Sequence, residues 1–259
     1  MTIVFDIGNT NITAAVFDGG NIILRFIMPV VSSGVSGPLI KKILREASIN
    51  PGGLDGAVIG SVVPAMTKKA AGMLKKSFKL APVLFTPSTK MNVRNMYKNK
   101  KEVGDDRLAN AAGAVMLYGR RDMVIVDFGT AITFDVVDRR ARYLGGVIMP
   151  GIKLSLKALY EGTARLPAIS MDYPRRIIGD NTAEAMQSGV KNSAIAAVKF
   201  IVEEIRKELG AKTLKIIFTG GDADIRLAHA SLKKRVIMDR DLTLKGLKHI
   251  YDLNRGKRV

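Results

Sequence analysis

The hydrophobic and polar positions of this chain follow two periods, and both halves of the chain contain each of them. Short apolar runs between turn residues predict strands over 2–7, 12–17 and 22–30, and "AVIGSVVP" (57–64) and "PVLFT" (82–86) read as two more. Apolar residues at helical spacing predict helices over 37–48 and 65–79. The first half therefore reads as a strand series followed by alternating helices and strands.

The second half repeats this order after a polar, irregular stretch at 88–103 and an alanine-rich helix at 106–118. A new strand series begins at residue 123, a helix follows Pro150-Gly151 to about 161, and 181–208 is a long helix or a broken pair of helices. "IIFTGGDA" (216–223) reads as a strand and a turn, and the last helix covers 243–253. This alternation predicts an α/β fold with two domains, 1–118 and 119–259, although no linker composition marks the boundary.

One phrase occurs twice. "VFDIGNTNITAAVFD" (4–18) aligns with "IVDFGTAITFDVVD" (125–138) when one residue, Asn9, is omitted. The matched pairs are Asp6 with Asp127, Gly8 with Gly129, Thr10 with Thr130, Ile12 with Ile132, Thr13 with Thr133, Val16 with Val136 and Asp18 with Asp138. We interpret this as an internal duplication. Because two copies are too few for a solenoid, we expect two related domains that face each other across a cleft.

The residues of the repeated turn fit a phosphate. Glycine allows a tight bend and a close approach of the backbone to a ligand. The amides of Gly8, Asn9 and Thr10 can point at phosphate oxygens. The carboxylate of Asp6 alone would repel a phosphate, but Mg²⁺ is bound by one or two carboxylates together with substrate phosphates. The alternative is a plain hairpin with turn-forming residues, and the second copy in register favours the phosphate site.

Composition narrows the choice of chemistry. The chain has 259 residues, no cysteine, two histidines (His229 and His249) and a net charge of +18. Disulfides, thiolate metal sites and cysteine nucleophiles are excluded, and neither a G-x-x-x-x-G-K-[ST] loop nor a strand-linked G-x-G-x-x-G occurs. The sequence begins with a strand pattern rather than a signal peptide, and no apolar run has the roughly 20 residues of a membrane helix. We therefore expect a cytoplasmic protein without a membrane partner.

The positive charge has two interpretations, a polyanion partner or a lysine-rich surface around a site for anionic substrates. The basic residues occur in scattered pairs and not in one block, and no nucleic-acid-binding motif accompanies them. The second interpretation is favoured, so no specific nucleic-acid partner is expected.

The paired Asp-x-Gly-x-Thr hairpins resemble the phosphate motifs of the acetate and sugar kinase, Hsp70 and actin superfamily. Further segments resemble, in the same order, the motifs of type III pantothenate kinases. These are "DIGNTN" (6–11), "GDDR" (104–107), "DFGTAITFDVVD" (127–138), "YLGGVIMPG" (143–151), "LYEGTARLP" (159–167), "NTAEAMQSG" (181–189) and "FTGGDA" (218–223). The resemblance covers nearly the whole chain and implies two domains of duplicated ribonuclease H-like, or actin-like ATPase, topology.

The resemblance also implies a reaction, the ATP-dependent phosphorylation of pantothenate to 4'-phosphopantothenate at the start of coenzyme A biosynthesis, with Mg²⁺, K⁺ or NH₄⁺, and a homodimer. Asp106 would be the catalytic base, and Asp127 would bind the monovalent cation. Asp6 would bind Mg²⁺ directly or through a water. ATP would contact Asp6, Ile7, Gly8, Asn9, Thr10, Asn11, Ile12, Thr13 and Thr130. Pantothenate would contact Tyr97, Gly104, Asp105, Asp106, Arg107 and Thr182.

Two residues depart from the family pattern. Lys100 stands where a proline is expected, which could loosen the loop that carries Tyr97, and Asp105 adds a carboxylate where a small residue is common. For "DDR" the alternative is a helix amino terminus with acids that favour the helix dipole and a solvated Arg107. Thr182 could simply start a helix, and Asp222 could lie on an adenosine-side turn or in an ordinary loop.

Two other functions remain open from the sequence. One is a kinase of the same superfamily with a sugar or a short acid as acceptor. The other is a non-catalytic, DNA-binding regulator on the same fold. The presence of Asp6, Asp106, Asp127 and Thr130 argues against lost catalysis but does not exclude a second role.

Overall fold

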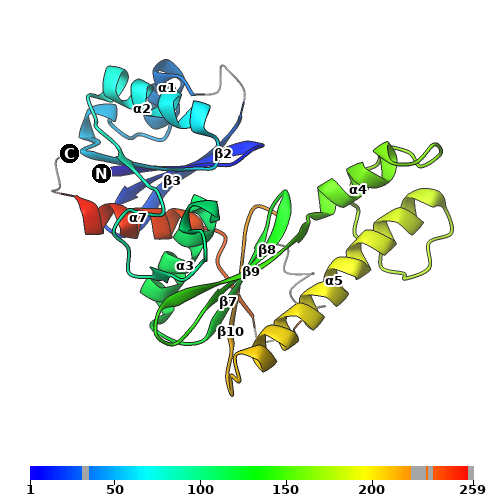
Figure 1. The fold of residues 1–259 in the computed structure, drawn as a ribbon. Helices are drawn as coiled ribbons and strands as arrows, with labels where there is room; N and C mark the ends of the chain where they lie inside the picture. The colour runs from blue at the N-terminus through cyan, green and yellow to red at the C-terminus, as the bar shows by residue number, and fades with distance from the viewer. Residues whose placement is uncertain (31–34, 223–231, 233–235, 256–259) are drawn as a thin grey trace. The chain divides into compact units, whose positions relative to one another are not determined.

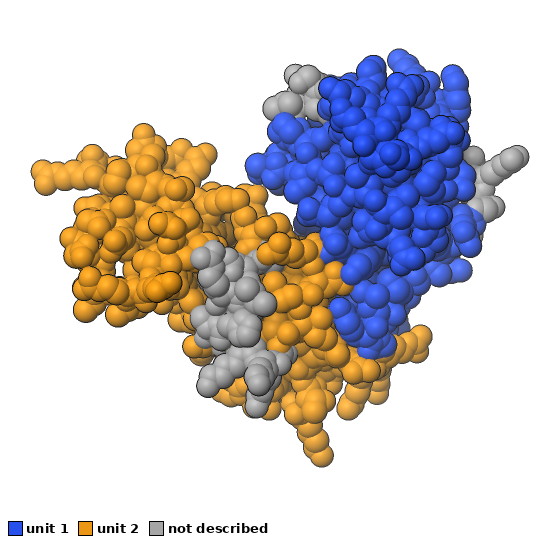
Figure 2. Space-filling view, turned by 180° about the vertical axis from the view of Figure 1, so that it is seen from behind, with its two compact units in different colours: residues 1–119, 141–143, 241–259 blue, residues 120–140, 144–240 orange. Residues whose placement is uncertain are grey.

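The computed structural model describes residues 1–30, 35–222, 232 and 236–255 (Figure 1). The chain forms two compact units, coloured in Figure 2, and each is described by itself. Unit 1 contains Met1–Gly119, Ala141–Tyr143 and Asp241–Val259, and unit 2 contains Arg120–Arg140 and Leu144–Arg240. The predicted ranges 1–118 and 119–259 divide the chain by its repeated motifs, whereas these units divide it by packing. The motif-based division stays a prediction.

Unit 1 is built on a five-stranded sheet in the order β3-β2-β1-β4-β5. Its strands are β1 (Thr2–Ile7), β2 (Asn11–Asp18), β3 (Asn21–Pro29), β4 (Gly56–Ser61) and β5 (Val83–Leu84). β1 is antiparallel to β2 and parallel to β4. The predicted strands are all present, but β5 has two residues where five were predicted, because only Val83 and Leu84 pair with β4.

Helices cover both faces of this sheet. Helices α1 (Gly37–Glu46) and α2 (Pro64–Phe78) pack on the face that carries Ile3, Phe5 and Ile7 of β1. Ser36 caps α1 by accepting the Leu39 N–H at 3.4 Å, as expected for serine at this position. The short 3₁₀ turns η1 (Pro51–Gly53) and η2 (Lys100–Glu102) complete the connections.

The other face of the sheet packs against α7 (Leu242–Asn254), which itself crosses α3 (Asp105–Tyr118). Glycine makes this crossing close, since a Cβ on Gly113 would lie 2.8 Å from the Leu242 carbonyl oxygen. Thr243 Oγ1 also donates a buried hydrogen bond of 2.7 Å to Asn110 Oδ1. This packing places the end of the chain in unit 1, although sequence order groups it with the second motif.

Unit 2 contains β7 (Met123–Phe128), β8 (Ala131–Val137), β9 (Arg142–Pro150), β10 (Lys215–Thr219) and β11 (Val236–Met238), in the order β11-β10-β7-β8-β9. The first residues of β9, Arg142 and Tyr143, belong to unit 1 and pair with β6 (Arg94–Asn95). Helices α4 (Ile152–Glu161) and α5 (Thr182–Glu208) belong to unit 2, and α5 packs on one face of its sheet. The segment 181–208 is one continuous helix, so the alternative of a broken pair is wrong.

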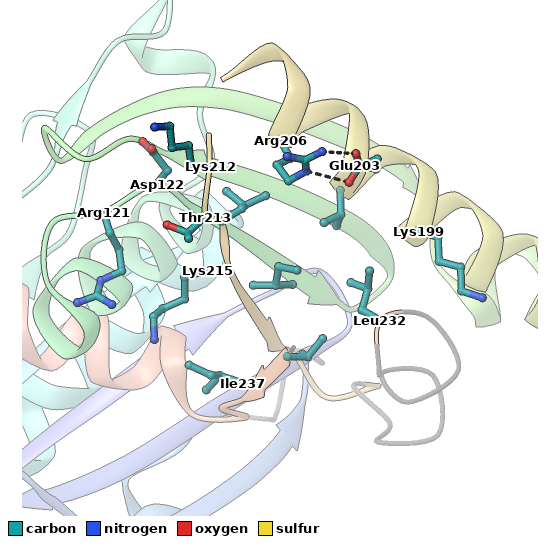
Figure 3. A pocket seen from close by; sticks show the side chains of 14 residues that line it. Arg121, Asp122, Lys199, Glu203, Arg206, Lys212, Thr213, Lys215, Leu232 and Ile237 are labelled. Atoms are coloured by element: carbon teal, nitrogen blue, oxygen red, sulfur yellow. Dashed lines mark hydrogen bonds and ion pairs between the residues drawn. The ribbon is translucent and has the colours of Figure 1, made fainter. Parts of the chain in front are cut away.

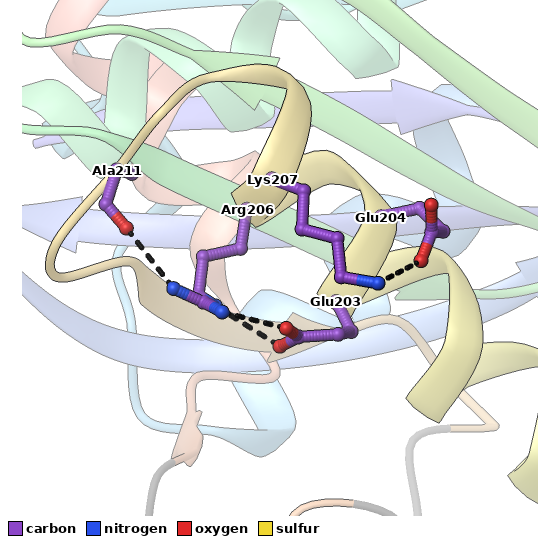
Figure 4. A network of polar contacts seen from close by, with 5 residues as sticks. All are labelled: Glu203, Glu204, Arg206, Lys207 and Ala211. Carbon is purple, nitrogen blue, oxygen red and sulfur yellow. Dashed lines mark hydrogen bonds and ion pairs between the residues drawn. The ribbon is translucent and has the colours of Figure 1, made fainter.

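The last turn of α5 is held by charged side chains, shown in Figure 4. Arg206 donates to both carboxylate oxygens of Glu203, at 3.0 and 2.6 Å, and to the Ala211 carbonyl at 3.4 Å. Lys207 donates to Glu204 at 2.8 Å. Basic side chains near the carboxyl end also favour the helix dipole, so these contacts fix the turn that leads into β10.

The two sheets repeat one plan, which confirms the duplication. Each sheet contains an antiparallel pair, β1–β2 or β7–β8, continued on one side by two parallel strands, β4 and β5 or β10 and β11, and the repeated residues occupy the same places in the two pairs. Asp6 pairs with Thr13 across β1 and β2, and Asp127 pairs with Thr133 across β7 and β8. The second turn is one residue shorter, as the alignment predicted. Within the described residues, no helix is both long and apolar enough to cross a membrane.

Candidate functional site

The first repeated turn presents polar groups at the end of β1. Gly8 N donates to Asn11 O at 3.0 Å, and Val30 N donates to Thr10 O at 2.9 Å, so the turn is fixed from both sides. Asn9, Thr10 and Asn11 are exposed. The predicted ATP residues Ile7 and Ile12 are instead fully buried in the core, so they can offer a ligand only backbone atoms. Asp6 and Thr13, directly paired, are partly buried beneath the turn.

The second repeated turn, in unit 2, is packed more tightly. Thr130 is exposed, and its carbonyl accepts the Gly151 N–H at 3.0 Å at the start of α4. Gly220, with φ +98°, follows β10, and a Cβ there would overlap Asp127 Oδ1 and the Phe128 carbonyl oxygen. The chain after β10 therefore lies directly against Asp127, which only glycine permits.

Thr219 is the neighbour of Asp127 across the parallel β7–β10 pair. Its side chain is 0% exposed, and its Oγ1 has no hydrogen-bond partner among the described residues. A buried hydroxyl without a partner is uncommon, because desolvation is then uncompensated. This oxygen is accordingly a candidate to meet a bound group near Asp127.

Asp222 belongs to the same end of the sheet. Its amide donates to Phe128 O at 2.9 Å, and its carboxylate pairs with Lys153 Nζ at 2.7 Å. Lys153 lies in the first turn of α4. The "GGD" turn is thus tied to both the second repeated turn and α4, and the choice between an adenosine-side turn and an ordinary loop stays open.

The "GDDR" segment starts helix α3 in unit 1. Gly104 is the N-cap, and a Cβ there would come within 2.5 Å of Asp106 Oδ1, so a side chain at 104 would displace that carboxylate. Asp106 Oδ1 accepts the Arg107 N–H at 2.9 Å, and Asp105 Oδ2 accepts the Ser61 N–H at 3.4 Å. Each carboxylate therefore has its own backbone donor.

Burial perturbs both acids. It raises the pKa of Asp105 from 3.8 to about 6, against the lowering effect of the Ser61 hydrogen bond and with a further rise from the charge of Asp106. Burial also raises the pKa of Asp106, partly offset by the Arg107 N–H and the Arg107 charge. Adjacent acids with raised pKa values are typical of sites where protons are moved.

Arg107 is not solvated, because only 6% of it is exposed. This excludes the plain helix-start alternative for that residue. Its guanidinium lies 5.8 Å from the centre of the Tyr143 ring, and the Tyr97 ring lies 6.2 Å from the same ring. Tyr143 is fully buried. The structure thus brings Arg107 and Tyr97, predicted only from motif order, to one aromatic side chain.

Sequence reasoning gave Tyr143 no role. The residue opens "YLGG", which was noted only as part of a motif, and its position next to Tyr97 follows from the two-residue β6–β9 pairing. An aromatic residue two positions before a glycine pair was the sole signal available.

The loop that carries Tyr97 is ordered by asparagine side chains rather than by a proline. Asn95 Oδ1 accepts the Tyr97 N–H at 3.0 Å, and Asn95 Nδ2 donates to Lys100 O at 3.4 Å. Asn99 then caps the η2 turn by accepting the Lys101 N–H at 3.2 Å. These asparagine hydrogen bonds order the loop with Lys100 in place of the expected proline.

Thr182, in unit 2, is the first residue of α5, but Asn181 is the cap and accepts the Glu184 N–H at 3.0 Å. The hydroxyl of Thr182 is therefore not required for capping, and the residue is exposed. The predicted residues divide between the units: Asp6 to Thr13, Tyr97 and Gly104 to Arg107 lie in unit 1, and Asp127, Thr130 and Thr182 lie in unit 2.

Unit 2 also contains a pocket of about 680 Å³, shown in Figure 3, that no sequence motif predicted. Arg121, Asp122 and Lys215 line it at the starts of β7 and β10, whereas Asp127 and Thr219 lie at the ends of these strands. Asp122 and Asp127 are five positions apart, which corresponds to roughly 16 Å along a strand. The pocket is therefore separate from the second repeated turn.

Comparisons with known proteins agree with the motifs. The model of the type III pantothenate kinase family matches residues 2–204. A type III pantothenate kinase of an Exiguobacterium species is 36% identical over 257 residues, covering 98% of this chain and 99% of that protein. The enzyme of the same name from Agathobacter rectalis is 34% identical over 262 residues and covers both chains completely.

Solved structures support the fold. A Campylobacter jejuni protein grouped with Baf family transcriptional activators has a TM-score of 0.60 and 23% identity over 97% of this chain and 98% of its own. The Clostridium difficile activator of 2-hydroxyisocaproyl-CoA dehydratase, determined with bound ADPNP, has a TM-score of 0.53 and 13% identity over 100% of this chain and 98% of its own. These identities carry the fold alone, which is the duplicated actin-like ATPase fold that the sequence predicted. The matching family model and the full-length relatives show that the chain belongs to the type III pantothenate kinase family.

Proposed function

We propose that this protein transfers the terminal phosphoryl group of ATP to the primary hydroxyl of pantothenate, with Asp106 as the base and Arg107 as the ligand of the pantothenate carboxylate. Membership in the type III pantothenate kinase family supports the reaction. The observation that supports these residue roles is the first turn of α3, where a partly buried acid with a raised pKa precedes a buried arginine.

Phosphoryl transfer depends mainly on positioning and on charge neutralisation, with a base to accept the hydroxyl proton. The Asp106 carboxylate accepts an N–H from its own helix, which fixes its orientation. Its raised pKa increases its affinity for the proton that the hydroxyl loses. Arg107 can pair with a carboxylate through two parallel N–H donors, and its guanidinium lies over the Tyr143 ring at 5.8 Å from the ring centre.

The first repeated turn is proposed to hold the ATP phosphates. Its exposed residues, Asn9, Thr10 and Asn11, offer backbone and side-chain donors beside Gly8. Mg²⁺ neutralises phosphate charge when bound, and Asp6, at the strand end below the turn, would hold it directly or through a water. One carboxylate next to a phosphate cradle is the kind of donor set that this ion takes.

Asp127 is proposed to hold K⁺ or NH₄⁺, and Thr130 to contact ATP. The groups next to Asp127 offer oxygen atoms that a monovalent cation can bind, beside the backbone nitrogen of Phe128. They include the Thr219 hydroxyl, which is buried without a partner among the described residues, and the Phe128 carbonyl. Such a cation supplies positive charge near the anionic reactants. Asp127 would orient it, and Gly220 keeps the space beside Asp127 free of a side chain.

Three finer points complete the proposal. A homodimer is supported by large apolar side chains exposed on unit 2, with Ile178 at 73%, Phe200 at 67% and Ile148 at 61% exposure.

The +18 charge is proposed to serve anionic substrates and general solvation, without a specific nucleic-acid partner. The proposed location is the cytoplasm.

The decisive experiment measures ATP consumption by the purified protein with pantothenate, with and without K⁺. Glucose and acetate replace pantothenate in parallel reactions, because a kinase with another acceptor is the competing function. Turnover that requires pantothenate and rises with K⁺ supports the proposal. Turnover with another acceptor and none with pantothenate would overturn it.

A further inference from the structure

The Ser61 N–H, at the end of β4, has no partner strand beside it among the described residues and donates its hydrogen bond to Asp105 instead. β4 pairs with β5 only at Val58 and Ile59, and the last bond on this side is Phe85 N to Ile59 O at 2.8 Å. On the β1 side the ladder continues to Val62 N and Ile7 O, at 3.1 Å. In a parallel sheet, the backbone N–H and C=O groups of successive residues point to the neighbouring strands on opposite sides in turn. The Ser61 N–H therefore points to the same side as the Ile59 C=O, which is the side where β5 has ended.

Asp105 Oδ2 takes the place of the missing strand acceptor, at 3.4 Å from Ser61 N. The two residues are 44 positions apart in the sequence, so this contact joins separate elements. Ser61 is itself held, because its Oγ accepts the Val63 N–H at 3.1 Å. The first turn of α3 is consequently attached to a fixed point at the end of β4.

The attachment places α3 next to the first repeated turn. Ser61 lies opposite Ile7 in the parallel β1–β4 register, and Ile7 follows Asp6. Neighbouring strands are about 4.8 Å apart. All of these residues belong to unit 1. Asp105 thus fixes the turn that carries Asp106 and Arg107 one strand away from the turn proposed to hold the phosphates.

The two acids of this turn have different tasks. Asp106 bonds the N–H of its own helix, whereas Asp105 is turned away from that helix towards β4. The N-cap Gly104 has no side chain with which to fix the helix start. Asp105 is therefore the side chain that connects the helix start to the sheet, rather than a group directed at a substrate.

We propose that Asp105 is a positioning residue: it fastens the first turn of α3 to the end of β4 and thereby orients Asp106 and Arg107 for phosphoryl transfer. This replaces the substrate-contact role expected from the motif. The catalytic consequence rests on the proposed function, whereas the attachment itself does not.

The test compares Asp105→Asn, which keeps an oxygen acceptor for the Ser61 N–H, with Asp105→Ala, which removes it. We expect turnover of the alanine variant to fall about tenfold and that of the asparagine variant to stay within about threefold of wild type, because misplacement of a catalytic group costs up to about 10²-fold. Asp122→Ala is the matched control, since the Asp122 carboxylate also accepts one backbone N–H, from Arg139 at 3.0 Å. Asp122 lies in unit 2, at the end of the sheet opposite Asp127.

A second measurement does not depend on any substrate. Hydrogen exchange at the Ser61 amide should accelerate in Asp105→Ala and remain slow in Asp105→Asn, because a hydrogen-bonded amide exchanges only on local opening. Unchanged exchange in the alanine variant would overturn the attachment. Equal loss of turnover in both variants would assign Asp105 to direct substrate contact and overturn the positioning role. Absence of pantothenate phosphorylation by the wild type would instead refute the proposed function and leave the exchange result valid.

Discussion

Replacing Asp105 with asparagine should stabilise the protein, and increasingly so as the pH rises. The pKa of Asp105 is raised from 3.8 to about 6, with burial as the largest cause. A carboxyl whose pKa is raised on folding favours the folded state fully below the unfolded pKa, and this contribution is lost as the pH rises through the folded pKa. The relevant window therefore runs from about pH 4 to about pH 7.

The magnitude follows from the shift. One pKa unit corresponds to 1.36 kcal/mol, so a shift from 3.8 to about 6 sets an upper limit of roughly 3 kcal/mol. Asp105 is only partly buried, and solvent screening reduces this to about 1.5 kcal/mol. Asparagine carries no charge and can still accept the Ser61 N–H. For a chain of this size, the gain corresponds to a rise in Tm of about 3–6 °C above pH 7.

Thermal melting curves of wild type and Asp105→Asn between pH 4 and pH 8 provide the assay. The difference in Tm should be small at pH 4, grow through pH 6 and level off above pH 7. Asp122→Asn controls for the loss of one carboxylate that accepts a backbone N–H. A difference that stays constant with pH, or an asparagine variant less stable than wild type at pH 8, would refute the reasoning. Confirmation would show that Asp105 opposes stability, a trade-off common at functional sites.

Four further outcomes are expected. Asp106→Asn should lower turnover about 10²–10⁴-fold without unfolding, because an amide cannot accept the hydroxyl proton, and a variant with more than about half of wild-type turnover would rule out Asp106 as the base. Asp6→Asn should raise the Mg²⁺ concentration needed for half-maximal activity, and unchanged Mg²⁺ titrations with unchanged turnover would remove Asp6 from the metal site. Asp127→Asn should weaken activation by K⁺ more than it alters the Mg²⁺ requirement, and a wild-type response to K⁺ would falsify the cation assignment. Binding to DNA should be non-specific and fade steeply near physiological salt, as expected for lysine contacts, and a sequence-selective complex surviving there would favour the regulator.

The repeated hairpins were predictable because their signals are local. Alternating apolar residues fix which side chains face the core, and glycine marks the turn between the strands. The one-residue offset read from the sequence reappears as the shorter turn between β7 and β8. The lengths and starts of most helices were predictable for the same reason.

Features that depend on distant partners were not predictable. β11 has three residues, and β9 was not foreseen as a strand, since its glycine pair weakens a strand pattern. The placement of α7 in unit 1 depends on the close packing of Gly246 against Ala109 of α3, and a single sequence does not reveal this contact between distant residues. The contact of Tyr143 with Arg107 and Tyr97 arises from a pairing of only two residues.

The duplicated strand ends have diverged in a way that matches their proposed tasks. Gly60 lies beside Asp6 in unit 1, and Thr219 lies beside Asp127 at the equivalent place in unit 2. After Gly60, the Ser61 amide receives Asp105 and fixes the helix that carries the proposed base. After Thr219, Gly220 lets the chain approach Asp127 and leaves a buried hydroxyl beside it. The corresponding strand end thus receives an acid from a helix in one copy and leaves a buried hydroxyl beside a carboxylate in the other, a difference that fits the proposal of Mg²⁺ for Asp6 and a monovalent cation for Asp127.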